Sequence, residues 1–285
     1  MIAMKYTYYP GCTSQTTAVE FGLSTDAVCD ALGIELAELE DWNCCGASSA
    51  HSLNHELSLA LPGRNVALAQ EAGRDMVIPC PACYQHSLMA DNRFREDAAW
   101  RQKMEGLLDF QYRGEGRPRH LLEVMATDLP SDVLAAKVIR PLTGLKVACY
   151  YGCVLVRPPE LTGWDDPEYP MTMDRLMAAI GAEPVDWSYK VDCCGASMTL
   201  SLSDVVVELS TKIVEGALEA GADCIVSACG MCQINLDTRQ VASRPVPILY
   251  FTELMGVALG LPEVDKWLRK HTVDPRPVLK SYGLL

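Results

Sequence analysis

Two octapeptides decide the fold of this chain: KYTYYPGC at residues 5–12 and KVACYYGC at residues 146–153. Each joins a short run rich in β-formers to a glycine and a cysteine, which is typical of a strand that ends in a turn. The pentapeptide CCGAS also occurs twice, at residues 44–48 and 193–197. Because both segments recur in the same order, the sequence indicates an internal duplication.

The cysteines follow the same duplication. The first half reads C-x31-CC-x34-C-x2-C and the second reads C-x39-CC-x34-C-x2-C, so the second copy has eight additional residues after its first cysteine. We expect these residues within RPPELTGWDDPEYP, at 157–170, because its four prolines favour a surface loop. The repeated cysteines are Cys12, Cys44, Cys45, Cys80 and Cys83 in the first half and Cys153, Cys193, Cys194, Cys229 and Cys232 in the second.

Strand-like and helix-like segments alternate along both halves. The runs YTYY, MVI, VACYY and CIVS precede longer stretches with helical spacing of apolar residues, as at 18–32, 57–72 and 205–220. This alternation predicts the α/β class, with two homologous Rossmann-like parallel-sheet units. Because the cysteines follow the ends of predicted strands, they should converge on the carboxyl edge of each sheet.

The duplication also predicts the domain organisation. We place the first module at residues 1–135 and the second at 136–285. The connecting linker between the halves is expected from about Pro130 to Gly144.

Composition excludes several classes of protein. The chain has 285 residues, of which 49% are hydrophobic and 21% charged, as in globular proteins. Its net charge of −13 repels phosphate backbones, so no nucleic-acid partner is expected. The sequence has neither a membrane-spanning stretch nor a signal-peptide run, so we expect no membrane span and a cytoplasmic location. Thirteen cysteines in that reducing compartment favour metal or thiol chemistry over disulfides.

The paired cysteines favour a metal centre with several metal atoms. Adjacent side chains point in different directions, so a CC pair suits two metals of one cluster, and a C-x2-C turn at a helix start presents two sulfurs. Gly46 and Gly195 let the backbone pass close to a bulky cluster, and Gly11 and Gly152 can do the same. Two alternatives stay open: a four-cysteine zinc site at one of the two centres, and a thioredoxin-like C-x2-C pair.

His51, His86 and Lys190 are candidate catalytic residues. His51 follows the first CCG loop and His86 lies just past Cys83, so either can deliver a proton to a leaving thiolate. Surface or capping histidines are the alternative. Lys190 precedes Cys193 by three residues and can neutralise an anionic substrate or cluster, unless it is a solvated surface charge.

The remaining cysteines and the tyrosines near the repeat are expected to pack. Cys29, Cys149 and Cys224 have no counterpart in the other half, so we expect buried thiols that bind no metal. Four tyrosines that precede the first cysteines are expected to pack around a cluster more than to lend hydroxyl groups. They are Tyr8, Tyr9, Tyr150 and Tyr151.

The double motif resembles the B subunit of heterodisulfide reductase, a family defined by two cysteine-rich CCG modules. The resemblance covers nearly the whole chain, and every ligand position of both modules is present. It implies two non-cubane [4Fe-4S] clusters that face one another, with a disulfide split between them. It assigns Cys12, Cys44, Cys45, Cys80 and Cys83 to one cluster and Cys153, Cys193, Cys194, Cys229 and Cys232 to the other.

The resemblance also implies a function. The chain is expected to be the iron–sulfur catalytic subunit of a heterodisulfide reductase or a similar complex, interconverting a small disulfide and thiols by two-electron transfer. Its expected partners are an iron–sulfur protein like the C subunit of that family and a flavoprotein like its A subunit, since the chain has no G-x-G-x-x-G or Walker A motif of its own.

Three alternatives to this function stay open. The chain can be a CCG subunit of a bacterial sulfur-oxidising complex, or an electron-relay subunit of a quinone- or flavin-linked oxidoreductase. It can also be a scaffold that zinc stabilises and that has no redox role.

Overall fold

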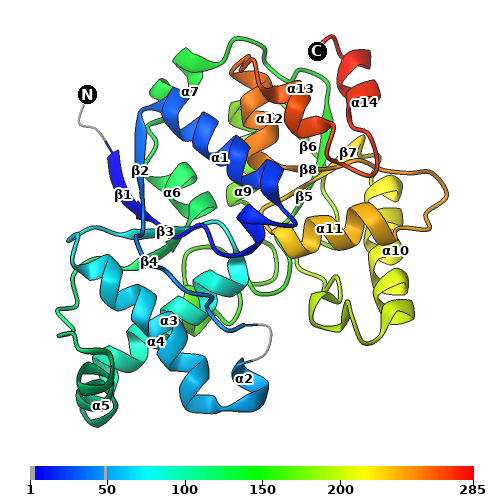
Figure 1. Ribbon diagram of the computed structural model, residues 1–285. Helices are drawn as coiled ribbons and strands as arrows, with labels where there is room; N and C mark the ends of the chain where they lie inside the picture. Colours follow the sequence, from blue (N-terminus) through cyan, green and yellow to red (C-terminus); the bar gives the residue numbers. More distant parts are fainter. Residues whose placement is uncertain (1–3, 48–49) are drawn as a thin grey trace.

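Two parallel sheets organise the protein, as a computed structural model shows for residues 4–47 and 50–285 (Figure 1). Their strand orders are β2-β1-β3-β4 and β6-β5-β7-β8, and all neighbouring strands are parallel. The strands of the first sheet are β1 (Met4–Tyr8), β2 (Ile34–Glu38), β3 (Met76–Ile78) and β4 (Pro118–His120). Those of the second are β5 (Lys146–Tyr150), β6 (Glu183–Pro184), β7 (Cys224–Ser227) and β8 (Ile248–Tyr250).

The two sheets repeat one topology. In each, the first strand along the chain lies between the second and the third, and the fourth follows at the far edge. The register runs from Met4 opposite Ile34 in the first sheet and from Lys146 opposite Glu183 in the second. The predicted α/β fold with two homologous parallel-sheet units is therefore confirmed.

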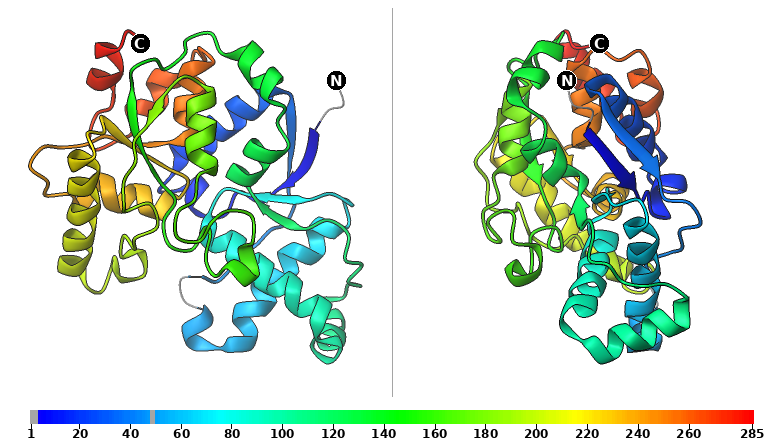
Figure 2. Two further views of the ribbon diagram at one scale, coloured as in Figure 1. Left: turned by 180° about the vertical axis from the view of Figure 1, so that it is seen from behind. Right: turned by 90° about the vertical axis from the view of Figure 1, so that its left-hand side faces the viewer.

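Helices form one layer between the sheets and cover their outer sides (Figures 1 and 2). The inner layer contains α1 (Val19–Leu32), α6 (Leu121–Thr127), α9 (Thr172–Ala179) and α12 (Phe251–Ala258), with α1 packed on α12 and α6 on α9. Outside the first sheet lie α3 (His55–Gln70), α4 (Pro81–Glu96) and α5 (Ala98–Leu108); outside the second lie α10 (Ser203–Glu219) and α11 (Gly230–Arg239). The shorter helices are η1 (Thr13–Gln15), α2 (Ala50–Leu53), α7 (Ser131–Lys137), α8 (Pro159–Thr162), η2 (Ala196–Met198), α13 (Val264–Leu268) and α14 (Arg276–Ser281).

A shared hydrophobic core joins the two halves. Phe21 of α1 stacks on Tyr250, with ring centroids 4.3 Å apart, and the hydroxyls of Ser24 and Thr252 lie 2.6 Å apart. The predicted linker contains α7, whose Leu134 is buried in the same core. The module boundary near residue 135 stays a prediction, because the core continues across it.

The predicted surface loop at 157–170 is more ordered than its prolines suggested. It contains α8, and Thr162 and Pro170 are buried. The side-chain amide of Gln85 in α4 donates to the carbonyl oxygen of Arg157 over 2.8 Å. Trp164 packs against the shared core. A hydrogen bond to α4 and apolar packing on the shared core therefore hold this segment of the second half in place.

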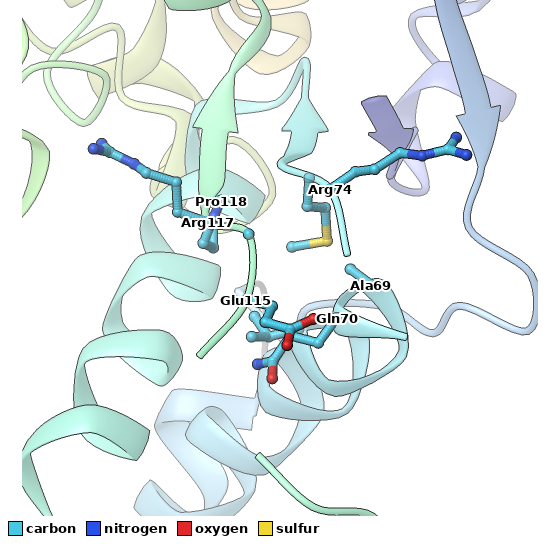
Figure 3. A pocket seen from close by; sticks show the side chains of 9 residues that line it. Ala69, Gln70, Arg74, Glu115, Arg117 and Pro118 are labelled. Atoms are coloured by element: carbon cyan, nitrogen blue, oxygen red, sulfur yellow. The ribbon is translucent and has the colours of Figure 1, made fainter. Parts of the chain in front are cut away.

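A small pocket lies at the edge of the first sheet opposite to the cysteines (Figure 3). Met76 and Pro118, which begin β3 and β4, form part of its wall. Gln70 and Glu115 lie close together there, while the Arg74 side chain extends away.

No described helix has the length and apolar character needed to cross a membrane.

Candidate metal centre

The ten repeated cysteines lie beyond the carboxyl ends of matching strands. In the first half they follow β1, β2 and β3, and in the second half they follow β5, β6 and β7. Cys80 and Cys229 directly precede α4 and α11, which places Cys83 and Cys232 in the first helical turns. The topology therefore puts one set of five thiols at the edge of each sheet.

Pairs of sulfur atoms approach each other in the same way in both halves. The Sγ atoms of Cys45 and Cys83 lie 3.2 Å apart, and those of Cys194 and Cys232 lie 3.4 Å apart. Within the described residues, no three Cys, His, Asp or Glu side chains form a group suited to a single metal ion. The two halves thus share sulfur pairs of the same kind between the CC pair and the C-x2-C turn.

Each set contains three buried thiols and two that are more exposed. Cys45, Cys80 and Cys83 are buried, as are their counterparts in the second half. Cys12, Cys44 and Cys193 are exposed, and Cys153 is half-buried. Both sets therefore reach the surface at the first cysteine and at the first member of the CC pair.

Two glycines approach the buried sulfurs closely. Gly11 has a φ of +69°, and a Cβ atom there would lie 3.2 Å from Cys83 Sγ. Gly152 has a φ of +72°, and a Cβ atom would lie 3.0 Å from Cys232 Sγ. Any larger residue would intrude on the thiols, so both positions suit a bulky group held by these sulfurs.

Gly46 and Gly195 serve a different purpose in the described structure. They also have positive φ values, but an added Cβ would lie 2.9 Å from Leu61 and 3.2 Å from Val206, respectively. These contacts are with apolar side chains, so the two glycines allow the loops to turn against α3 and α10. Their predicted role toward a cluster stays a prediction.

Backbone amides and thiols stabilise negative charge on several sulfurs. The amides of Gly46 and Gly195 donate to Cys44 Sγ and Cys193 Sγ over 3.4 and 3.3 Å. The hydrogen bond from Cys83, aided by amides at the start of α4, lowers the pKa of Cys80 to about 7. Hydrogen bonds from Cys83 and Cys232 likewise lower the pKa of Cys45 and Cys194, and these thiols suit metal ligation, which requires deprotonated sulfur. Hydrogen-bonded thiols or burial raise the pKa of the other affected members of the two sets, which are Cys12, Cys83, Cys153 and Cys232.

The donor set fits an iron–sulfur cluster in each half. Within each half the first cysteine is a close neighbour of the CC pair, and the C-x2-C cysteines are neighbours of that pair and of each other. Gly11 and Gly152 leave space beside these thiols. Cysteine thiolates are the usual ligands of such clusters, and hydrogen bonds from amides to sulfur are among the features that tune them.

Cys29, Cys149 and Cys224 lie apart from these sets. Cys29 is in α1, Cys149 is in β5 and Cys224 begins β7, and all three are buried. Burial raises the pKa of each thiol well above its ordinary value. This environment favours neutral, apolar packing, and the expectation that the three thiols bind no metal stays a prediction.

The two candidate histidines lie in the first half. His51 belongs to α2, but its side chain is outside the described residues. His86 is half-buried in α4, three residues past Cys83, at the repeat position of Asn235. The Asn235 amide donates to the carbonyl oxygen of Cys194 over 3.2 Å and lies 3.9 Å from its sulfur. His86 thus occupies the repeat position of a residue that contacts the second CC pair, and its catalytic role stays a prediction.

Lys190 is not a solvated surface charge. Its side chain is buried, and Nζ donates to Asp174 Oδ1 over 2.6 Å and to the carbonyl oxygen of Pro170 over 3.1 Å. The ammonium also lies 4.5 Å from the ring centre of Tyr169. Because Asp174 already balances the charge, the predicted contact with an anionic substrate or cluster stays a prediction.

Two tyrosines make hydrogen bonds that the sequence did not predict. Tyr9 Oη donates to the carbonyl oxygen of Asn43 over 2.9 Å, and Tyr150 Oη donates to that of Asp192 over 2.6 Å. Both acceptors directly precede a CC pair. The alignment of Tyr9 with Tyr150 in the repeated octapeptides was the available signal, but packing alone also explains two buried aromatic residues.

Comparisons with known proteins agree with this geometry. The 8-methylmenaquinol:fumarate reductase membrane anchor subunit of Wolinella succinogenes is 29% identical over 280 residues, which cover 95% of this chain and 97% of that protein. The B subunit of the ferredoxin:CoB-CoM heterodisulfide reductase of Methanosarcina mazei is 29% identical over 283 residues, which cover 95% of this chain and 94% of that protein.

A solved structure supports the fold alone. The crystal structure of a hypothetical protein from Helicobacter pylori has a TM-score of 0.72 and 12% sequence identity, over 94% of this chain. This chain spans about half of that protein, 51% of its length.

The family model named CCG, cysteine-rich domain, matches residues 6–86 and 147–237, which together make up more than half of the chain. Each match includes one complete set of five repeated cysteines. The similarity to the B subunit of heterodisulfide reductase, inferred from the motif, is confirmed by its homologues. The chain therefore belongs to the CCG cysteine-rich domain family.

Proposed function

We propose that the chain is the iron–sulfur subunit of a heterodisulfide reductase-like complex and interconverts a small disulfide and two thiols. The observation that carries the proposal is the presence of two matching five-cysteine sets in one body. In the reducing direction, the sulfur–sulfur bond breaks, two electrons arrive from a partner protein, and two protons complete the two thiols. The oxidising direction reverses each of these changes.

The ten repeated cysteines are the proposed ligands of two non-cubane [4Fe-4S] clusters, five thiolates to each. When bound, such clusters supply one-electron transfer and a metal that has affinity for sulfur. The relatives named as heterodisulfide reductase subunits support this assignment. A zinc site in one half is the alternative that metal analysis separates.

The chain's own residues form the buried side of each proposed site, the entry for the substrate and the source of protons. Buried Cys83 and Cys232 lie at the start of α4 and α11, where packed side chains exclude water. The substrate is proposed to enter between the loops at Gly46 and Gly195, beside the exposed thiols. His86 in α4 is the proposed donor of a proton to the leaving thiolate. His51 in α2 is a second candidate for this role.

Partner proteins are part of the proposal. Several relatives are named as lettered subunits of heterodisulfide reductases, which supports a multi-subunit complex. We propose an iron–sulfur protein like the C subunit of that family and a flavoprotein like its A subunit as the electron donors or acceptors. A cytoplasmic location belongs to the same proposal.

A relay without substrate binding is the second candidate function. The relative from Wolinella succinogenes matches the whole chain as well as the heterodisulfide reductase subunit does, and its name assigns it to a menaquinol:fumarate reductase. In that case the chain passes electrons between a quinone- or flavin-linked partner and another protein of the complex. A bacterial sulfur-oxidising complex would instead run the thiol chemistry in the oxidising direction.

Anaerobic EPR spectroscopy with and without small thiols tests the proposed function. The proposal predicts a paramagnetic iron–sulfur signal that changes when the thiol binds, and disulfide turnover with a chemical electron donor. A signal that no thiol alters, in protein that still exchanges electrons with a quinone analogue, would favour the relay.

A further inference from the structure

We infer that Tyr9 and Tyr150 are positioning residues that hold the two CC loops, residues 43–46 and 192–195, in the shape that ligation needs. The inference rests on the iron–sulfur function proposed above. Each tyrosine lies three residues before the first cysteine of its half, and each reaches the residue directly before the CC pair. The same contact therefore occurs at both sites of the duplication.

The two rings are fixed by their surroundings. Both side chains are fully buried. Tyr9 meets Trp42 edge-on at a centroid distance of 5.5 Å, and Tyr150 lies 6.3 Å from Trp187. Both tryptophans belong to the segments that lead into the CC pairs. A buried ring held by a second ring directs its hydroxyl group with little freedom.

The two hydroxyl groups lie beside the repeated thiols. Cys83 and Cys45 are the thiol neighbours of the Tyr9 hydroxyl, and Cys232 and Cys194 are those of the Tyr150 hydroxyl. Each phenol therefore lies close to the proposed ligand sulfurs while it donates to the carbonyl of the CC loop.

The neighbouring tyrosines of the repeat do not share this contact. Tyr8 Oη is buried and meets no hydrogen-bond partner in the described part of the chain. Tyr151 Oη donates to Asp174 Oδ2 over 2.7 Å. Of these four tyrosines, Tyr9 and Tyr150 are the two that reach the carbonyls before the paired cysteines, so Tyr8 is a matched control for the loss of a buried hydroxyl.

The halves differ in how many donors hold the loop carbonyl. Asn43 O also accepts from Asn65 Nδ2 over 2.7 Å. Val214 occupies the repeat position of Asn65 in the second half, and its side chain has no donor. Loss of the tyrosine hydroxyl should therefore affect the second loop more than the first.

Phenylalanine substitutions test the inference in anaerobically prepared protein. Tyr150→Phe should release half of its iron to a chelator about tenfold faster than the wild type, since one buried hydrogen bond is lost and the other half is unaltered. Tyr9→Phe should show the same change with a smaller factor, and Tyr8→Phe should retain the wild-type rate. The EPR signal of the affected half should shift in the first two variants.

Wild-type release rates and unaltered EPR signals in both Tyr9→Phe and Tyr150→Phe would overturn the inference. An equal acceleration in Tyr8→Phe would also overturn it, because any buried hydroxyl would then have the same effect. Wild-type protein that binds iron but turns over no disulfide would contradict the proposed function while leaving these rates measurable. Wild-type protein without iron would overturn both.

Discussion

The two CC loops occupy equivalent positions in the repeat, but different charged side chains stabilise the segments that precede them. Asp41 and Lys190 occupy one repeat position, three residues before the CC pair, yet they carry opposite charges. The Asp41 side chain is 82% exposed and pairs with Arg64 at the surface. The Lys190 side chain is 1% exposed and pairs with buried Asp174. After duplication, the ten cysteines and the tyrosines that donate to the loop carbonyls stayed equivalent, while the charged groups beside them diverged.

The largest effect is expected from the loss of one repeated cysteine, which should disrupt one site and leave the other intact. Cys44→Ser should lose the iron of the first half, and Cys193→Ser should lose that of the second, because each removes one of five ligands. Both variants should lose disulfide turnover, since the proposed reaction uses both sites. Metal analysis and an activity assay measure this. Near-normal turnover in a variant that lacks one cluster would favour the relay function.

The next effect compares the two charged supports. Lys190→Met should lower the free energy of unfolding by about 3–5 kcal/mol, because it leaves the Asp174 carboxylate buried without its partner. Asp41→Asn should cost about 0–1 kcal/mol, because the Asp41 carboxylate is exposed and its ion pair with Arg64 is at the surface. Denaturant unfolding of both variants measures the difference. Equal costs would show that burial does not distinguish the two supports.

Two buried histidines beside the inner helices should respond to pH in opposite directions. Burial lowers the pKa of His120 to about 3, so its contribution to stability is present above its unfolded pKa and falls toward acid. Burial opposes protonation of His271, but Glu253 at 2.9 Å raises its pKa to about 9. The contribution of His271 is therefore fully present below its unfolded pKa of about 6.5 and is lost as pH rises through about 9.

Denaturant unfolding of the wild type and of His271→Gln at several pH values tests this assignment. The wild type should lose up to about 3 kcal/mol of stability between about pH 6 and pH 10 that the variant does not lose. Parallel pH profiles for the two proteins would show that His271 is not charged in the folded state.

The smallest effect concerns the three cysteines outside the repeat. Cys29→Ser, Cys149→Ser and Cys224→Ser should each keep the full iron content and cost about 1–2 kcal/mol of packing energy. The comparison with Cys44→Ser is direct, because the chemical change is the same. Loss of a cluster in any of the three would show that this chain uses ligands beyond the repeated pattern.

The repeated features could be predicted from the sequence, whereas the supporting contacts could not. Cysteine spacing and strand-like runs sufficed for two parallel-sheet units and for thiols at their edges, because both depend on local pattern. The Lys190–Asp174 pair joins a residue of α9 to one that precedes the second CC pair, and no short motif links them. The hydroxyl contacts of Tyr9 and Tyr150 bring together residues 34 and 42 positions apart. Prolines at 157–170 predicted a loop, but Trp164 packs that segment onto the core.

Iron and acid-labile sulfide analysis of the anaerobically prepared wild-type chain tests the central claim most directly. Two intact sets of five thiols predict close to two four-iron clusters in each chain, with sulfide in matching amount and without zinc. A preparation with one equivalent of zinc and the iron of a single cluster would contradict the claim that both halves hold the same cofactor.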